Sequence, residues 1–384
     1  MTAHALAAAG PVDLVFRDAL ILDGSGSAPM RGDVAVERGR IVAIGPELQV
    51  EAARTVDAAG LALMPGIVDS HTHFDAQITW DPTLAPSPAL GVTTAVIGNC
   101  GFTIAPCRPA DRELTMRNLT QVEGMSLGAL RAGIDWGFES FGEFMAQLRS
   151  KGSVANVAAY VGHSSVRTYV MGADAAKRVA TTDEIAAMQA IVRDAMAHGA
   201  VGFASSTSPA HNGEGGLPMP SRLASDAETA ALVGAMAEGG RGVYMLTKGG
   251  HTKMPFLESL AASTGRPVMV AALLHNSTNP SAVFDDLDAI AAANARGRRL
   301  MALWRLLGRG RLLGDSEEDP KYVQGGFERF KGAAGVVSRV IGAMARAYSK
   351  PLFMIAVIAA AIGVVAWWLI GLVDSGSPWL RAVL

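Results

Sequence analysis

The chain has 384 residues, which predicts two or three structural units and excludes a small disulfide-stapled fold. Half of the residues are hydrophobic and only 18% are charged, so the composition also excludes a disordered chain. The 33 basic and 35 acidic residues give a net charge of −2, which provides no electrostatic field for nucleic acid, and we predict no nucleic-acid partner. The two cysteines, Cys100 and Cys107, cannot form a disulfide framework and indicate a reducing compartment.

The N-terminal part of the chain, residues 13–64, consists of short β-branched runs separated by turn signals. The runs are VDLVF, ALIL, DVAVE and RIVAIG, and glycine-containing pairs such as Asp23-Gly24 and Arg38-Gly39 lie between them. Runs of this kind, bounded by such turns, are typical of hairpins. We therefore predict a small sheet of hairpins over this range.

Between residues 65 and 295, apolar runs of strand length alternate with longer alanine-rich segments of helical character. One such segment, TTDEIAAMQAIVRDAMAHG, begins with a threonine/aspartate cap signal and ends at Gly199. This alternation predicts a parallel sheet covered by helices. The strands are expected near 66–71, 92–98, 155–161, 200–205, 242–247 and 267–274.

The composition of the chain changes abruptly after Ala295. Residues 296–350 begin with a basic stretch, RGRRLMALWRLLGRGRLL, of amphipathic helical character, and we expect a linker here. Residues 351–373 form an uncharged run of 23 residues, long enough at about 1.5 Å per residue to cross a hydrocarbon core of roughly 30 Å. We predict a single transmembrane anchor, with a buried core helix as the alternative.

The distribution of charge around this run predicts its orientation. Several basic residues precede it and only Arg381 follows it, so the positive-inside rule places the N-terminal domain in the cytoplasm. The membrane is thus the predicted partner and localisation, and a cytoplasmic protein is the alternative.

Two histidines stand at the end of the first strand of the predicted parallel sheet, in the sequence PGIVDSHTHFD. Residues two apart in a strand point to the same side, so His71 and His73 can present both imidazoles to one metal ion. A His-x-His pair that closes an apolar strand after Pro-Gly is more specific than a chance pair of surface histidines. We predict that both histidines are metal ligands.

Cys100 follows the next strand, GVTTAVIGN, and is the third ligand candidate. A cysteine at a strand end is usually an inert core residue, but the C-terminal strand ends of a parallel α/β barrel form one active-site face. Cys100 then opens onto the same face as His71 and His73, and a thiolate is soft enough to prefer zinc. Cys107, in the loop APCRP, lacks this setting and is expected to be structural.

These motifs resemble those of the amidohydrolase superfamily. The resemblance is carried by MPGIVDSHTHFD, by VERGRIVAIG before it and by GVTTAVIGNCGFTIAP after it. The segments VGHSSVR at 161–167 and STSPAHNGEGG at 206–216, with NCGF, most resemble the D-aminoacylase branch, the N-acyl-D-amino-acid deacylases. The similarity spans about residues 13–295. It implies a TIM-like barrel beside a small β-sandwich, one or two zinc ions, and a zinc-activated water that attacks the amide of a small N-acyl amino acid.

The resemblance also implies roles for the three ligand candidates. His71 and His73 match the paired ligands of the first barrel strand, and Cys100 matches the ligand that bridges two metal ions in this branch. Two further histidines are expected at the ends of the fifth and sixth strands.

The fifth strand departs from this pattern. Thr247 or Lys248 stands where the histidine is expected, and His251 follows a few residues later. Lys248 would be a ligand only with a neutralised or carbamylated amine, and His251 only if the loop bends back. The sixth strand, RPVMVAALLHN, does end in a histidine, and we predict His275 as a further ligand.

Three residues on the expected catalytic face are candidates for substrate contacts. His163 closes the third strand, and its alternatives are a hydrogen bond to a metal ligand or a structural role. Arg167 would pair with a substrate carboxylate, or else be solvated. His211 lies in a glycine-rich loop after the fourth strand and would shape the pocket for the acyl group.

The chain does not supply everything that the resemblance implies. An eight-stranded barrel needs two more strands after His275, and the family takes its catalytic aspartate from the eighth. No strand is expected after Ala295, and Asp315 lies in an acidic turn, so no general base is found. Three accounts compete: a truncated or fused hydrolase, strands supplied by another subunit, or an inactive remnant.

The predicted fold class is therefore α/β: a partial TIM-like barrel (65–295), a small N-terminal β-sandwich portion (13–64) and a C-terminal transmembrane helix (351–373). The predicted function is metal-dependent hydrolysis of carbon–nitrogen bonds other than peptide bonds, of the N-acyl-D-amino-acid deacylase type. The alternative is a catalytically inactive, membrane-tethered binding or adaptor protein derived from such an enzyme.

Overall fold

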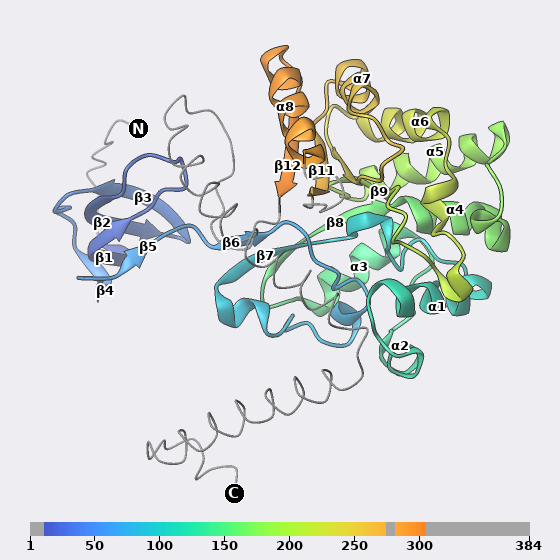
Figure 1. Cartoon of the computed structure of the whole chain (residues 1–384). Coiled ribbons are helices and arrows are strands. Elements are labelled where there is room, and N and C mark those ends of the chain that lie inside the picture. Colours follow the sequence, from blue (N-terminus) through green and yellow to red (C-terminus); the bar gives the residue numbers. More distant parts are fainter. Residues whose placement is uncertain (1–10, 274–280, 305–384) are drawn as a thin grey trace, which may run out of the picture. The chain divides into compact units, whose positions relative to one another are not determined.

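The computed structural model describes residues 11–273 and 281–304 (Figure 1). The chain divides into two compact units, residues 1–307 and 308–384, and all described residues belong to the first.

The N-terminal strands form a five-stranded sheet. Its strands are β1 (Val12–Ile21), β2 (Met30–Glu37), β3 (Arg40–Gly45), β4 (Ala52–Asp57) and β5 (Ala62–Leu63). The first three form an antiparallel meander, as hairpins predict, whereas β4 and β5 both run parallel to β1. Successive β2 residues, Val34 and Ala35, belong to different apolar clusters because side chains alternate across a strand. The predicted sandwich portion is thus represented, in the described residues, by one sheet with apolar side chains on both faces.

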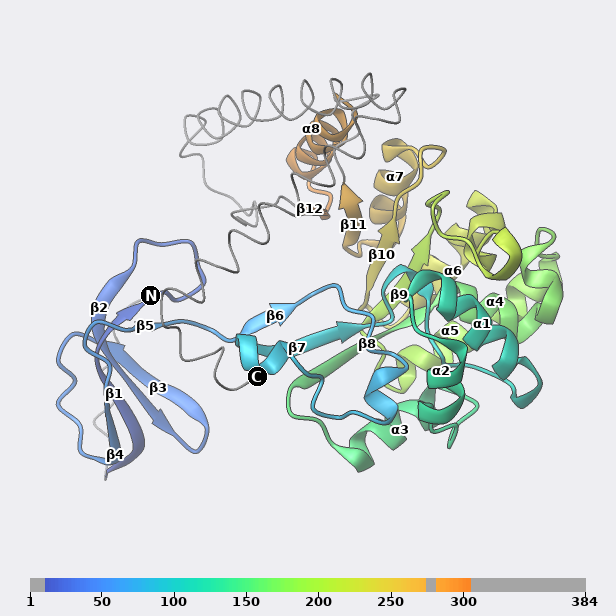
Figure 2. The same cartoon turned by 60° about the horizontal axis from the view of Figure 1, so that its bottom comes forward.

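The second sheet is parallel throughout and has its strands in chain order (Figure 2). Every neighbouring pair is parallel, as the alternation of strands and helices predicts. Parallel neighbours in chain order, with a crossover after each strand, are the arrangement of a partial β/α barrel. The strands are β6 (Ile67–Asp69), β7 (Val92–Ile97), β8 (Asn156–Gly162), β9 (Gly202–Ser206), β10 (Val243–Thr247), β11 (Val268–Leu273) and β12 (Leu300–Trp304).

Helices cover the outer side of this sheet (Figure 1). Side chains on alternate strand positions divide between two environments: Phe203 packs in the main core with the helices, whereas the next residue, Ala204, packs in a small cluster on the other face. The predicted cap of the helix that ends before Gly199 is confirmed, since Thr181 and Glu184 form a capping box. The helices are α1 (Arg112–Val122), α2 (Leu127–Gly133), α3 (Phe141–Lys151), α4 (His163–Met171), α5 (Thr182–Ala197), α6 (Asp226–Ala237), α7 (Met254–Thr264) and α8 (Ala282–Ala295).

A seventh barrel strand follows α8, where no strand was expected. Residues Leu300–Trp304 of β12 pair with β11 in parallel, beginning with Leu300 opposite Val268. The LMALW run is too short for its periodicity to distinguish a helix from a strand, and pairing with the edge of β11 decides the outcome. The expectation that the barrel rhythm ends at Ala295 is therefore wrong.

The predicted fold class is also wrong in including a C-terminal transmembrane helix. None of the helices in the part of the chain that the structure describes combines the length and the apolar character needed to cross a bilayer. Residues 351–373 and most of 296–350, on which the membrane prediction depended, lie outside the described residues. The fold is a mixed α/β unit built on a curved parallel sheet, and we retain neither the membrane anchor nor the membrane partner.

Candidate metal centre

The loop after β6 carries His71 and His73, and the residue between them fixes its position. Thr72 is buried, and both its backbone nitrogen and its hydroxyl donate to the carbonyl oxygen of Val96, at 3.1 and 2.7 Å. Because Thr72 points into the protein, the residues on either side of it project together in the other direction. The two imidazole rings lie with their centroids 5.2 Å apart.

Cys100 lies in a tight turn after β7 that needs glycine at positions 98 and 101. The φ angle of Cys100 is +58°, and those of Gly98 and Gly101 are +83° and +75°. Residues other than glycine rarely adopt φ angles in this region. A Cβ atom on Gly98 would lie 2.5 Å from the carbonyl oxygen of Tyr160 in β8. The backbone of the turn is therefore pressed against the neighbouring strand, and the thiol has little freedom to move.

Two side chains connect this turn to the histidine loop. The amide nitrogen of Asn99 donates to the carbonyl oxygens of Thr72 and Val96, at 3.2 and 2.8 Å. Asp75 is buried and accepts a hydrogen bond from the backbone nitrogen of Gly98 at 3.0 Å. Burial raises the pKa of Asp75 to about 7. These hydrogen bonds hold the loop and the turn together.

The three ligand candidates converge on one point. The Sγ atom of Cys100 lies 3.4 Å from Nε2 of His71 and 3.8 Å from Nε2 of His73. A tetrahedral zinc ion, with Zn–S of about 2.3 Å and Zn–N of about 2.0 Å, separates its sulfur and nitrogen ligands by about 3.5 Å. Within residues 11–273 and 281–304, these three side chains are the one group of histidine, cysteine and carboxylate residues arranged to hold a metal ion. The donor set fits zinc in both chemistry and spacing.

Glu123, at the C-terminal end of α1, is a site residue that the sequence analysis missed. Its Oε1 atom lies 2.9 Å from Nδ1 of His73. A carboxylate on Nδ1 fixes the ring so that Nε2 faces the cluster. Burial alone would lower the pKa of His73, but the contacts with Cys100 and Glu123 outweigh it and raise that pKa to about 11. No sequence signal distinguishes Glu123 from an ordinary glutamate at a helix end.

The end of β10 brings one of its three candidates to the cluster. The hydroxyl of Thr247 lies 3.1 Å from Sγ of Cys100. Lys248 instead forms an ion pair with Asp286 of α8, at 2.9 Å, and His251 is exposed. His275 lies outside the described residues. The structure therefore does not bring Lys248 or His251 to the cluster, and we do not propose them as ligands.

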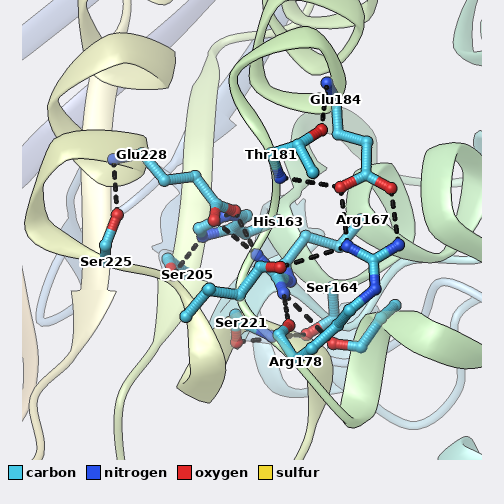
Figure 3. Close-up of polar contacts among 12 residues, drawn as sticks. His163, Ser164, Arg167, Arg178, Thr181, Glu184, Ser205, Ser221, Ser225 and Glu228 are labelled. Carbon is cyan, nitrogen blue, oxygen red and sulfur yellow. Dashed lines mark hydrogen bonds and ion pairs between the residues drawn. The ribbon is translucent and has the colours of Figure 1, made fainter.

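His163 and Arg167, predicted as substrate contacts, converge on the carboxylate of Glu228 instead (Figure 3). Nε2 of His163 lies 2.9 Å from Glu228, and Nδ1 lies 2.9 Å from the hydroxyl of Ser205. Arg167 donates to both oxygens of Glu228, at 2.6 and 2.5 Å. Both side chains are 0% exposed, so we propose no substrate contact for either residue.

Opposing effects set the protonation of this buried cluster. Burial lowers the pKa of His163 despite the nearby carboxylate. For Glu228, burial acts to raise the pKa, but the hydrogen bonds and charges of His163 and Arg167 outweigh it and lower the pKa. The cluster therefore contains an ionised carboxylate paired with Arg167, next to a neutral imidazole.

His211 is linked to the candidate ligand His73 through the ring of Phe102. Its ring contacts that of Phe102 edge-on, with centroids 4.8 Å apart, and Phe102 in turn stacks on His73 at 6.3 Å. The hydroxyl of Ser206 lies 2.6 Å from Nδ1 of His211. Burial, with the positive charges of His73 and Arg222, lowers the pKa of His211 to about 4. This histidine is neutral at pH 7 and half-buried at the edge of the cluster.

Comparison with known proteins identifies the family of this chain. A model of the amidohydrolase family matches residues 54–321. D-aminoacylase of Alcaligenes xylosoxydans xylosoxydans is 37% identical over 193 residues, which cover 50% of this chain and 37% of that protein. N-acyl-D-glutamate deacylase of the same organism is 33% identical over 226 residues, covering 59% and 43%. This chain thus spans less than half the length of these curated relatives.

Solved structures of proteins of the same two kinds are also similar to this chain. A structure of D-aminoacylase described as having a binuclear metal center superposes with a TM-score of 0.62 and 30% identity, covering 76% of this chain and 58% of that chain. N-acyl-D-glutamate deacylase from Bordetella bronchiseptica, complexed with zinc and a phosphonate inhibitor, superposes with a TM-score of 0.60 and 26% identity over the same shares. Because the family match covers well over half of the sequence, this chain belongs to the amidohydrolase family.

Proposed function

We propose that this protein is a zinc-dependent hydrolase of the D-aminoacylase type, which cleaves the amide of N-acyl-D-amino acids into a carboxylate and a D-amino acid. The observation that carries the proposal is the convergence of His71, His73 and Cys100 at distances that fit one zinc ion. The similarity to D-aminoacylase and to N-acyl-D-glutamate deacylase supports this substrate class.

The residues of this chain would have distinct roles in such a site, as metal ligands or as a group that positions a ligand. Nε2 of His71, Nε2 of His73 and Sγ of Cys100 would hold the ion, and three protein ligands leave a fourth tetrahedral position for water. Bound zinc lowers the pKa of its water to about 7 and polarises the substrate carbonyl. Glu123, whose Oε1 atom lies 2.9 Å from Nδ1 of His73, would favour a proton on Nδ1 and leave Nε2 to bind the ion.

His211 is the residue we propose at the substrate side of the site. The backbone nitrogen of Ser208 donates to the hydroxyl oxygen of Ser206, and in the tautomer that we propose this hydroxyl donates in turn to Nδ1 of His211. With Nδ1 accepting, Nε2 of the neutral ring carries the proton and donates a hydrogen bond. An acyl or carboxylate oxygen of the substrate is the acceptor that we propose.

The general base is not among the groups that contact the cluster in the described residues. No aspartate or glutamate in those ranges joins the three ligands as a fourth member. Glu123 is engaged with His73, and Asp75 with the backbone of Gly98. We therefore assign ligands, a positioning carboxylate and a substrate-side histidine, but no base.

The proposal is tested by substituting each cysteine in the full chain. Cys100→Ala is expected to abolish tight zinc binding and release of D-amino acid from a panel of N-acyl-D-amino acids. Cys107→Ala is the matched control, because Cys107 is also buried but contacts Thr115 rather than the histidines. Zinc content is measured by elemental analysis after dialysis. Unchanged zinc content in Cys100→Ala would contradict the site.

A further inference from the structure

Thr247 places a hydroxyl group against the candidate ligand sulfur. It is the last residue of β10, opposite Ser206 of β9, and its side chain is buried. Its Oγ1 atom lies 3.1 Å from Sγ of Cys100, within hydrogen-bonding distance for sulfur. A zinc-bound cysteine is a thiolate and only accepts hydrogen bonds, so the threonine hydroxyl must be the donor.

The Cys100 sulfur then has two kinds of neighbour: the histidine nitrogens that would share a metal ion with it, and a hydroxyl group that donates a hydrogen bond to it. The Nε2 atoms of His71 and His73 lie 3.4 and 3.8 Å from Sγ, and an ion held by all three side chains would lie among these atoms. The hydroxyl of Thr247 lies 3.1 Å from the same sulfur and takes one of the positions around it. A thiolate that bridges two ions needs a second open position on the sulfur, together with ligands that hold the second ion there.

The end of β10 does not provide such ligands. Thr247 offers a neutral hydroxyl, which is a poor zinc ligand compared with imidazole, thiolate or carboxylate. Lys248, the next residue, is held in an ion pair with Asp286 at 2.9 Å. Within the described ranges, the ligand cluster has three members, which is the number of protein ligands in a single catalytic zinc site.

From this geometry we infer that Thr247 is a positioning residue that donates a hydrogen bond to the Cys100 thiolate, and that Cys100 is a terminal ligand of one metal ion rather than a bridge between two. The inference rests on the proposed metal site and specifies its stoichiometry. It departs from the bridging role that the sequence resemblance implies for Cys100.

The stoichiometry is tested with cobalt, which substitutes for zinc and is visible by spectroscopy. The untagged full chain is titrated with Co²⁺, and bound cobalt is counted by elemental analysis while the EPR signal is recorded. One ion per chain is expected, with constant EPR intensity per ion throughout the titration. A second tightly bound ion that reduces this intensity through magnetic coupling across a shared thiolate would overturn the inference.

The hydrogen bond is tested by removing the hydroxyl without changing its volume. Thr247→Val is expected to shift the sulfur-to-cobalt charge-transfer band to lower energy, because the thiolate loses a donor. The same variant should bind zinc roughly 10-fold more weakly or worse, as is typical when a hydrogen-bond partner of a ligand is lost. Thr247→Ser, which keeps the hydroxyl, should restore both properties.

A matched control separates this effect from packing. Thr252 is buried in the same region, and its hydroxyl contacts Thr207 at 2.8 Å rather than the thiolate. Thr252→Val should leave the charge-transfer energy unchanged. An unshifted band in Thr247→Val, or an equal shift in Thr252→Val, would refute the role of Thr247.

The outcomes also distinguish this inference from the proposed function. Two coupled ions per chain, with D-amino acid released, would refute the terminal role of Cys100 and leave the hydrolase proposal intact. Absence of any tightly bound metal in the wild-type chain would refute both.

Discussion

Two histidines in this protein are each paired with a glutamate at the same distance, yet their surroundings suit them to different tasks. Nδ1 of His73 meets Glu123 at 2.9 Å, and Nε2 of His163 meets Glu228 at 2.9 Å. The difference lies at the other ring nitrogen. Nε2 of His73 faces Cys100, and the His73 side chain is 29% exposed. Nδ1 of His163 instead contacts the hydroxyl of Ser205, and the His163 side chain is fully buried.

The comparison shows that a histidine–carboxylate pair does not by itself indicate a functional site. Glu228 also pairs with Arg167, so the buried carboxylate is neutralised within the core and links α4 to α6. Glu123 instead leaves the second nitrogen of its histidine directed at a thiol. The group that faces the remaining nitrogen decides whether the pair connects helices or prepares a metal ligand.

The largest expected effect is a loss of stability on removal of the negative charge of Glu228 in its buried pair with Arg167. Glu228→Gln leaves the guanidinium of Arg167 buried without its counterion, and breaking a buried pair in this way costs about 3–5 kcal/mol of stability. Urea unfolding of the metal-free chain measures the loss. The control is Glu238→Gln, which removes an exposed pair with Arg193 and should change stability little. Equal losses in the two variants would contradict the structural role of the buried pair.

Substitution in the His73–Glu123 pair is expected to change stability less than substitution of Glu228, but to weaken zinc binding specifically. Glu123→Gln retains a hydrogen-bonding group but removes the negative charge beside His73, so zinc affinity should fall roughly 10- to 100-fold. Competition with a chromophoric chelator measures this change. Glu228→Gln, assayed under conditions where it remains folded, should retain the affinity of the wild type. A reversed pattern would exchange the roles assigned to the two glutamates.

The smallest expected effect is a difference in pH dependence. The pKa of His163 is lowered in the folded state, so the unfolded chain binds the extra proton first. The associated stability is therefore fully present above pH about 6.5 and declines as the pH falls below that value. The midpoint of urea unfolding, measured from pH 7.5 to 5, should fall more steeply for the wild type than for His163→Gln. Parallel curves would show that His163 does not carry this effect.

The convergence of the candidate ligands was predictable where the residues follow strands directly. His71, His73 and Cys100 each lie within a few residues of a strand end, and the six expected strands appear within two residues of their predicted limits. The exception was β12, because a five-residue apolar run has no decisive periodicity of its own.

The partners of these residues were not predictable from local sequence. Glu123 and Glu228 reach their histidines across about 50 and 65 residues of chain, and both lie on or beside helices with no distinguishing motif. Thr247 was noted only because it stands where a histidine was expected. Such contacts depend on how helices dock on the sheet, which no short pattern encodes.

The double hydrogen bond from Thr72 to the carbonyl oxygen of Val96 has a consequence for kinetics. Together with Asn99, it sets the separation of the histidine loop and the cysteine turn before any ion arrives. The site then behaves as a rigid chelator, in which folding has already removed the conformational freedom of the donor atoms. The rate of metal capture should accordingly follow the rate at which each ion sheds its water, and differ between zinc and slowly exchanging nickel even though the protein is the same.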